Sequence, residues 1–428
     1  MAQISRRSFI KWASTIGALG VFGCSINYPH SPRLRLEKAR VVVVGGGFAG
    51  ASAAKYLKLL NRALEVTLVE RHAHYLSCPG SNEVIAGLKR LEELHWKYDV
   101  LRNVRGIQTV KAEVQAIDVE RRTVRLADGS AIPYDRLIVA PGIDFRWDAI
   151  DGYDETASAS APHAWQAGAQ TMLLHRQLRA MPNGGLVLIT APPNPYRCPP
   201  GPYERASLIA HFLKHHKPRS KVLILDAKTQ FSKQSLFFQG WKELYPGMVE
   251  WISAEKEGKI ERVDAGSRVV YTEFDEHRVD VLNVIPPQKA GELAHRAGLT
   301  DQSGWCPVDP KTFTSTLVPN VHIIGDACTA TPMPKSAFAA NSQAKACAVA
   351  VIDLLQGRES GYPSLINHCY SFLQADYAIS ITGVYEYSQT EKQLKAVSTG
   401  ESPMNGDRRR EAEHARNWQK VIAVDAFG

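Results

Sequence analysis

The chain has 428 residues, of which 44% are hydrophobic and 22% are charged, and its formal net charge is +8. This length accommodates two or three domains, and this composition excludes a largely disordered protein. The basic residues form no long stripe interleaved with aromatic side chains, so nucleic-acid binding is not expected. The positive surplus suits an anionic substrate or an acidic partner protein instead.

The N-terminus has the organisation of an export signal. Residues 5–11, with the sequence SRRSFIK, precede a modestly apolar stretch, residues 12–23, that is too short for a mature membrane anchor. We interpret residues 1–30 as a twin-arginine signal segment, and the alternative is an amphipathic N-terminal helix. Cys24 ends a degenerate lipoprotein-type cleavage site and is either lipidated, or discarded or left unmodified. We therefore expect a periplasmic protein with no integral membrane segment in its mature chain.

A dinucleotide-binding motif follows the signal. Residues 41–44 are all valine, which indicates a strand buried on both faces. The spacing G-x-G-x-x-G comes next, at Gly45, Gly47 and Gly50. Such glycines permit the tight turn, the approach of a pyrophosphate to the backbone and the packing of the helix on the strand. A second strand, residues 65–70, ends at Glu70, which is placed to bind ribose hydroxyl groups.

Two further strands of the same domain lie far apart in sequence. Residues 134–142 and 318–327 each indicate a buried strand that ends in a small-residue turn. Both resemble motifs of the two-dinucleotide-domain flavoproteins, the family that includes glutathione reductase. The resemblance implies an α/β fold with two Rossmann-like domains and FAD as the cofactor. It places Asp326 on the ribityl chain of FAD, although taken alone Asp326 could be a helix N-cap. Val114 and Gly142 are assigned to the same cofactor site.

The split arrangement implies an inserted second domain. Its expected parallel strands, residues 185–190 and 221–226, are separated by a helical stretch, residues 203–216. A proline-rich loop, residues 191–202, stands where relatives that use NAD(P)H carry a second glycine fingerprint. Because prolines have no N–H group to offer a pyrophosphate, NADH is not an expected substrate. The inferred divisions are 1–30 (signal), 36–150 (FAD-binding domain, first part), 151–280 (inserted domain), 281–355 (FAD-binding domain, second part) and 356–428 (C-terminal interface region covering the flavin).

The cysteines are candidates for redox chemistry. Cys198 lies in the proline-rich loop at the carboxyl end of a parallel strand, where open α/β sheets bind ligands, and Cys369 lies early in the C-terminal region. These two residues are either a redox pair or buried small hydrophobic side chains. We treat the cysteines at 306, 328 and 347 as structural. No C-x-x-C or C-x-x-C-H pattern occurs, so zinc, iron–sulfur clusters and a haem on this chain are not expected.

A closer resemblance covers essentially the whole mature chain. Residues 196–205 (YRCPPGPYER), residues 333–345 (MPKSAFAANSQAK) and the ending, residues 417–428, resemble the flavoprotein subunit of flavocytochrome c sulfide dehydrogenase. The resemblance implies that Cys198 and Cys369 form a redox-active disulfide beside the flavin. It also implies a thioether between FAD and Cys78, which stands in the pattern C-x-x-S-N-E-V. The alternative is a free Cys78 that lines a substrate pocket.

The activity implied by this resemblance is oxidation of sulfide, with electrons passed to a separate c-type cytochrome subunit. The C-terminal region is expected to contribute the cytochrome surface. Lys335 and Lys345 either stabilise the negative charge of the reduced flavin or are solvated lysines.

Three other functions stay open. One is a sulfide:quinone reductase-like enzyme, which is disfavoured because the C-terminal region carries a strongly polar run, residues 407–413, and shows no apolar face that could dock on a membrane. Another is an accessory flavoprotein of a sulfur-oxidation system. The last is an NADH-dependent disulfide reductase, which the missing second fingerprint and the absence of a C-x-x-x-x-C pair disfavour.

Overall fold

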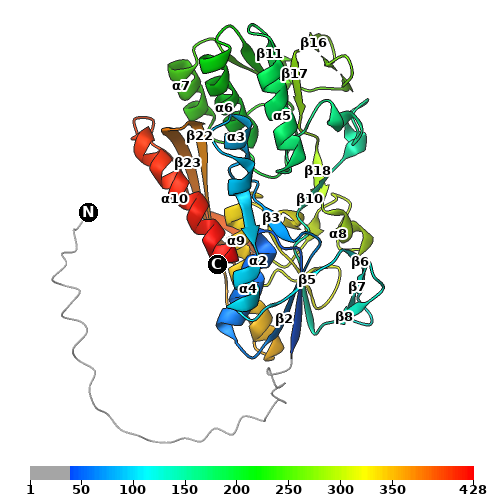
Figure 1. Cartoon of the computed structure of the whole chain (residues 1–428). Coiled ribbons are helices and arrows are strands. Elements are labelled where there is room, and N and C mark those ends of the chain that lie inside the picture. Colours follow the sequence, from blue (N-terminus) through cyan, green and yellow to red (C-terminus); the bar gives the residue numbers. More distant parts are fainter. Residues whose placement is uncertain (1–38) are drawn as a thin grey trace, which may run out of the picture. The chain divides into compact units, whose positions relative to one another are not determined.

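The computed structural model describes residues 39–428, which form two α/β domains and a C-terminal sheet with a closing helix (Figure 1). The expected export signal, residues 1–30, and Cys24 lie outside the described residues. Helix α10 (Arg408–Phe427) runs along one side of both domains in this view. Among the helices of residues 39–428, none combines the length and the apolar character needed to cross a bilayer.

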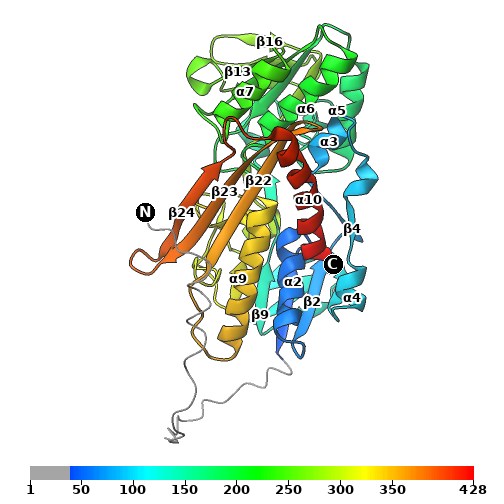
Figure 2. The same cartoon turned by 90° about the vertical axis from the view of Figure 1, so that its left-hand side faces the viewer.

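The first domain is built on a five-stranded parallel sheet with the order β20-β9-β1-β2-β5. Its strands are β1 (Arg40–Val44), β2 (Glu65–Glu70), β5 (Gln108–Lys111), β9 (Arg136–Val139) and β20 (Val321–Ile323). The valines of β1 are at most 5% exposed, because the strand lies inside the sheet and helices cover it. Helices α2 (Phe48–Leu60) and α9 (Ala337–Leu355) lie side by side against this sheet (Figure 2).

The inserted domain has its own four-stranded parallel sheet with the order β13-β12-β11-β17. The strands are β11 (Leu186–Ala191), β12 (Lys221–Asp226), β13 (Val249–Ile252) and β17 (Val281–Val284), and the helices are α5 (Ala169–Ala180), α6 (Gly201–His216) and α7 (Gln234–Leu244). Because β17 pairs with β11, the inserted domain extends beyond the boundary at residue 280 that the sequence suggested. The antiparallel strands β10 (Ile143–Phe145) and β18 (Gln288–Ala290) connect the two domains.

The C-terminal region is an antiparallel sheet followed by α10. Its strands are β22 (Ser364–Gln374), β23 (Tyr377–Ser388) and β24 (Gln393–Glu401). Our expectation that this region lacks an apolar face is wrong, since α10 buries one. The buried side consists mostly of alanines, which a hydropathy pattern registers weakly among many charged residues. Its members are Ala412, Ala415, Ile422, Ala423, Ala426 and Phe427.

Smaller elements complete the described chain. They are β3 (His74–Leu76), α3 (Ser81–Ile85), β4 (His95–Lys97), α4 (Asp99–Asn103), β6 (Val114–Asp118), β7 (Thr123–Leu126), β8 (Ala131–Pro133), β14 (Arg262–Asp264), β15 (Val269–Tyr271), β16 (Glu276–Arg278), α8 (Glu292–Arg296), β19 (Cys306–Pro307) and β21 (Cys328–Thr329), besides short 3₁₀ turns.

The end of α10 is fixed to the first domain by an aromatic cluster and a carboxylate. The Phe427 ring is 2% exposed and lies 5.2 to 6.2 Å, centroid to centroid, from four other rings. These belong to Phe48, Tyr75, Trp96 and Tyr98. Two residues before the end of the helix, Asp425 accepts a hydrogen bond from Tyr56 at 2.8 Å and pairs with Lys345 at 2.7 Å. The helix therefore closes over the same face on which α2 begins.

We predict that Phe427→Ala lowers the free energy of unfolding by about 3 kcal/mol, because it empties a buried aromatic site. Chemical denaturation followed by circular dichroism measures the change. The control is Val421→Ala on the same helix, where the side chain is 65% exposed and the expected change is below about 0.5 kcal/mol. Equal losses in the two variants would contradict the prediction.

Candidate active site

A cavity of about 870 Å³ lies where the two domains and the C-terminal region meet. Its volume is within the range of cofactor pockets. Its walls come from the glycine turn after β1, the proline-rich loop after β11, the turn after β20, and parts of β22 and α10. Of the residues predicted from the sequence, nine line the cavity: Gly45, Gly47, Glu70, Cys78, Val114, Gly142, Cys198, Asp326 and Cys369.

The glycine turn is shaped by close backbone contacts. Gly45 has a φ of +98°, and a Cβ there would lie 2.3 Å from the carbonyl oxygen of Ala140. A Cβ on Gly50 would lie 1.8 Å from the carbonyl oxygen of Gly45, so Gly50 acts by letting α2 pack against the turn rather than by lining the cavity. A Cβ on Gly47 would meet only an aromatic carbon at 3.5 Å. The turn and the start of α2 thus form a cradle for a phosphate.

Glu70 stands at the edge of this cradle. Its Oε2 atom accepts a hydrogen bond from the backbone N–H of Gly46 at 2.7 Å, and its Oε1 atom accepts one from His72 at 2.9 Å. These contacts fix the carboxylate at the carboxyl end of β2, where it lines the cavity. Its role as the ribose ligand stays a prediction.

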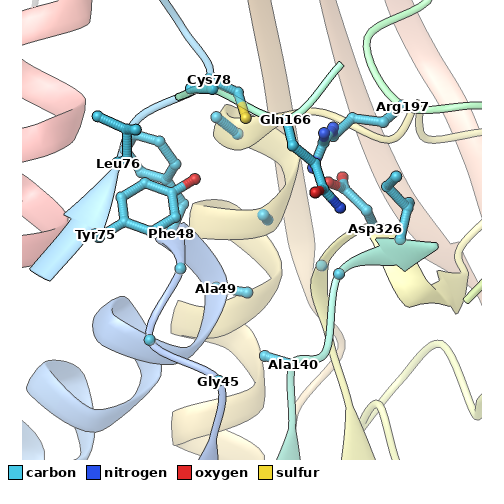
Figure 3. A pocket seen from close by; sticks show the side chains of 18 of the residues that line it. Gly45, Phe48, Ala49, Tyr75, Leu76, Cys78, Ala140, Gln166, Arg197 and Asp326 are labelled. Carbon is cyan, nitrogen blue, oxygen red and sulfur yellow. The ribbon is translucent and has the colours of Figure 1, made fainter. Parts of the chain in front are cut away.

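Asp326 lines the cavity from the turn after β20, in a 3₁₀ turn (Gly325–Ala327) rather than at a helix N-cap. Its Oδ1 atom is buried and has no hydrogen-bond partner within the described residues. Burial raises the pKa of this carboxyl group, and Arg197 and Lys335 act in the other direction. Figure 3 shows Asp326 and Arg197 on one wall and Tyr75 on the other, with Cys78 above the space between them. The unpartnered oxygen fits a cofactor hydroxyl group as donor.

Three cysteines from different elements line the cavity, and in the structure they are thiols. Cys78 is half-buried just before α3. Cys198 is half-buried, adopts a left-handed backbone with a φ of +59°, and donates its N–H to the carbonyl of Lys335 at 2.8 Å. Cys369, on β22, is 8% exposed. Burial raises the pKa of Cys198 and of Cys369, and a negative charge on Cys369 raises that of Cys198 further.

The sequence predicts Lys335 at the cofactor, but the structure places its ammonium behind the Asp326 turn, outside the cavity lining. Its Nζ atom donates to the carbonyls of Asp326 and Cys328, each at 2.8 Å, and lies 3.8 Å from the centre of the Trp305 ring. With two carbonyl acceptors close by in sequence, Lys335 stabilises the turn that carries Asp326. Lys345 is likewise engaged elsewhere, in its ion pair with Asp425.

Several cavity residues were not singled out by sequence reasoning. Glu204, on α6, accepts hydrogen bonds from the Asn82 side chain and the Phe372 N–H, both at 2.8 Å, and burial raises its pKa. Arg197 donates to the carbonyl of Trp165. Both charged residues belong to the same segment as Cys198, residues 196–205, so the charged residues of that segment could have pointed to them. Gln166, from an irregular segment, gave none.

The other three cysteines of residues 39–428 are buried in the first domain. Cys306 and Cys328 are free thiols that stand opposite each other in the parallel strands β19 and β21, and Cys347 lies within α9. Burial raises the pKa of Cys306 to about 12. Within residues 39–428, no group of three or more His, Cys, Asp or Glu side chains is arranged to hold a metal ion.

The fold and the cavity define the class of protein: an oxidoreductase with two dinucleotide-type domains and an FAD site. The model of the pyridine nucleotide-disulphide oxidoreductases matches residues 39–175. The model for the central part of the flavocytochrome c sulfide dehydrogenase flavoprotein chain matches residues 171–286, and that of its flavin-binding part matches residues 362–427. The chain belongs to this family, the flavoprotein chains of flavocytochrome c sulfide dehydrogenase.

Individual relatives agree with this assignment. The chain is 60% identical over 45 residues to the flavoprotein chain of flavocytochrome c sulfide dehydrogenase from Chlorobaculum thiosulfatiphilum, a stretch that is 10% of this chain and 94% of that sequence. It is 25% identical over 316 residues to the mitochondrial sulfide:quinone oxidoreductase of Mus musculus, covering 71% of this chain and 68% of that one. The sulfide:quinone oxidoreductase structure from Aquifex aeolicus shares the fold, with a TM-score of 0.71, 17% identity and 91% coverage of each chain. The protein is a flavoenzyme of the sulfide oxidoreductase type.

We predict that Gly50→Ala yields protein with little or no FAD, because the added methyl group would collide with the Gly45 carbonyl and force the turn open. The ratio of flavin to protein absorbance after purification measures this loss. Gly361→Ala, where a Cβ meets nothing within 4 Å, is the control and should keep a full complement of flavin. Normal flavin content in Gly50→Ala would show that the turn tolerates the shift.

Proposed function

We propose that this chain is the sulfide-oxidising flavoprotein subunit of a two-component enzyme that delivers electrons to a c-type cytochrome. The observation that carries the proposal is that Cys198, from the inserted domain, and Cys369, from β22, line the same cavity. A negative charge on Cys369 raises the pKa of Cys198, and the charges of Lys233 and Glu204 act on both thiols, so both cysteines lie in one electrostatic environment.

The residues that would hold FAD are distributed around the cavity. The glycine turn and the start of α2 would bind the pyrophosphate, Glu70 a ribose, and the unpartnered Asp326 oxygen a hydroxyl group of the ribityl chain. FAD, when bound, supplies an acceptor for the two electrons that sulfide oxidation releases. We further propose that Cys78, in the wall of the cavity, carries FAD through a thioether.

The sulfur chemistry belongs to the chain's own side chains. With Cys198 and Cys369 joined as a disulfide, the electron pair of a hydrosulfide ion forms a new S–S bond to one sulfur, and the old S–S bond breaks. One cysteine becomes a persulfide, which retains the hydrogen of the hydrosulfide, and the other leaves as a thiolate. Glu204 lines the same cavity, and because burial raises its pKa it can hold a proton at a higher pH than an exposed carboxyl group.

The proposal of a cytochrome as acceptor rests on the family assignment, and the net charge of +8 suits an acidic partner. A sulfide:quinone reductase-like activity is the second candidate, supported by the similarity to quinone-dependent relatives. It is less favoured because the apolar face of α10 packs inside the protein and is not free to enter a lipid surface. We also propose export to the periplasm by the twin-arginine route, on the pattern of residues 5–11.

We predict that anaerobic addition of stoichiometric sulfide bleaches the flavin absorbance of the parent protein and not that of Cys198→Ser or Cys369→Ser, because either change removes the disulfide. Stopped-flow absorbance measures the rate. Cys347→Ala removes a buried thiol remote from the cavity lining and should react like the parent. No bleaching in the parent would exclude sulfide as the substrate and favour an accessory role. Quinone reduction faster than cytochrome c reduction would favour the second candidate.

We predict that the flavin of the parent stays with the polypeptide after acid denaturation, whereas Cys78→Ala releases it, because only a thioether survives unfolding. Absorbance of the supernatant and the mass of the denatured chain report the outcome. Release of all FAD from the parent would show that Cys78 is a free thiol of the pocket.

A further inference from the structure

Lys233 is a buried lysine that reaches from the inserted domain to the strand that carries Cys369. It is 1% exposed and stands at the N-cap of α7, with a left-handed backbone at φ +62°. Its Nζ atom donates to the hydroxyl of Ser371 at 2.8 Å and to the carbonyl of Cys369 at 3.4 Å. Its backbone N–H donates to Glu401 at 2.9 Å. The side chain therefore crosses between two parts of the fold and ends beside the reactive cysteine.

This position is unfavourable for a lysine in two respects. A left-handed backbone at a residue with a Cβ is strained, and such strain is concentrated at functional sites. An ammonium removed from water is costly unless it is paired, yet among the described residues the Lys233 ammonium hydrogen-bonds only a hydroxyl and a carbonyl. An apolar side chain of similar length would fill the same volume without the energetic cost of removing a charge from water. Packing alone does not explain why a lysine stands here.

The charges around Lys233 come from each element packed against it. The inserted domain contributes Glu204, on α6, and Cys198, in the loop before α6. The C-terminal sheet contributes His368 and Cys369, on β22, and Glu401, at the end of β24. Burial lowers the pKa of Lys233, and negative charges on Cys369, Glu204, Cys198 and Glu401 oppose that effect. In return, Lys233 lowers the pKa of both cysteines, whereas Glu204 raises them.

We propose that Lys233 is a positioning residue that stabilises the thiolate released when the Cys198–Cys369 disulfide opens. The inference rests on the proposed function. The ammonium acts through space in a dry region, where a fixed charge interacts more strongly than in water. The positive charge stabilises the leaving thiolate relative to the intact disulfide. It therefore favours opening of the disulfide and makes the cysteine pair a better oxidant of sulfide. Hydrogen bonds to the Ser371 hydroxyl and the Cys369 carbonyl hold the ammonium beside the middle of β22, where Cys369 lies.

The test uses the reduced holoprotein and follows iodoacetamide alkylation of Cys198 and Cys369 by mass spectrometry as a function of pH. In Lys233→Met and Lys233→Gln, the pKa of the more reactive thiol rises, and its alkylation rate at pH 7 falls about tenfold, as one pKa unit requires. Equilibration with a dithiol redox buffer should show the disulfide about 30 mV more reducing, since a tenfold change corresponds to that value for a two-electron couple.

Two controls separate charge from structure. Lys233→Arg keeps the positive charge and should alkylate within about threefold of the parent, an allowance of half a pKa unit. Lys242→Met removes an exposed lysine from the same helix and should change neither readout. Folded neutral variants with the parent's alkylation profile and disulfide potential would overturn the proposal. This test does not depend on sulfide turnover. If sulfide does not bleach the flavin of the parent, the proposed function is refuted. If the alkylation profile of the neutral variants is unchanged, the role of Lys233 is refuted.

Discussion

The parallel pairing of β20 with β9 determines which parts of the chain meet at the cavity. Through this ladder the chain returns to the first sheet after the inserted domain, so the turn at Asp326 comes to the same sheet edge as Gly45 and Gly142. The following helix, α9, packs on α2 and leads to β22, which carries Cys369. The cavity forms only when β20 joins the first sheet, because its walls come from residues that are far apart in sequence.

A second constraint is the burial of the thiols. Burial disfavours the thiolate form of Cys198 and Cys369, and thiol–disulfide exchange needs that form. The inserted domain supplies charges of both signs to this region, Glu204 from α6 and Lys233 from the start of α7. A domain that lacks the second glycine fingerprint thus still brings charged side chains to the thiols, near its interface with β22.

Much of the fold and part of the site could be predicted from the sequence because their signals are local. The glycine spacing, the valine strand and the terminal Glu70 fix a backbone shape within a few residues, and the structure has that shape. The contacts of Lys335 could not be predicted, because its ammonium donates to the carbonyls of Asp326 and Cys328, a preference that no sequence spacing reveals. Lys233 and Glu204 went unnoticed because their importance arises from neighbours more than a hundred residues away. The apolar face of α10 was missed because alanines dominate it.

The placement of α10 also affects the order in which the protein becomes able to retain its cofactor. Trp418 and Gln419 of this helix line the cavity, and Phe427 packs against Phe48 and Tyr75, which line it too. All other described elements precede α10 in the chain. During synthesis the other walls of the cavity therefore emerge from the ribosome before α10 does. The cofactor can be fully enclosed only when α10 has also emerged and docked.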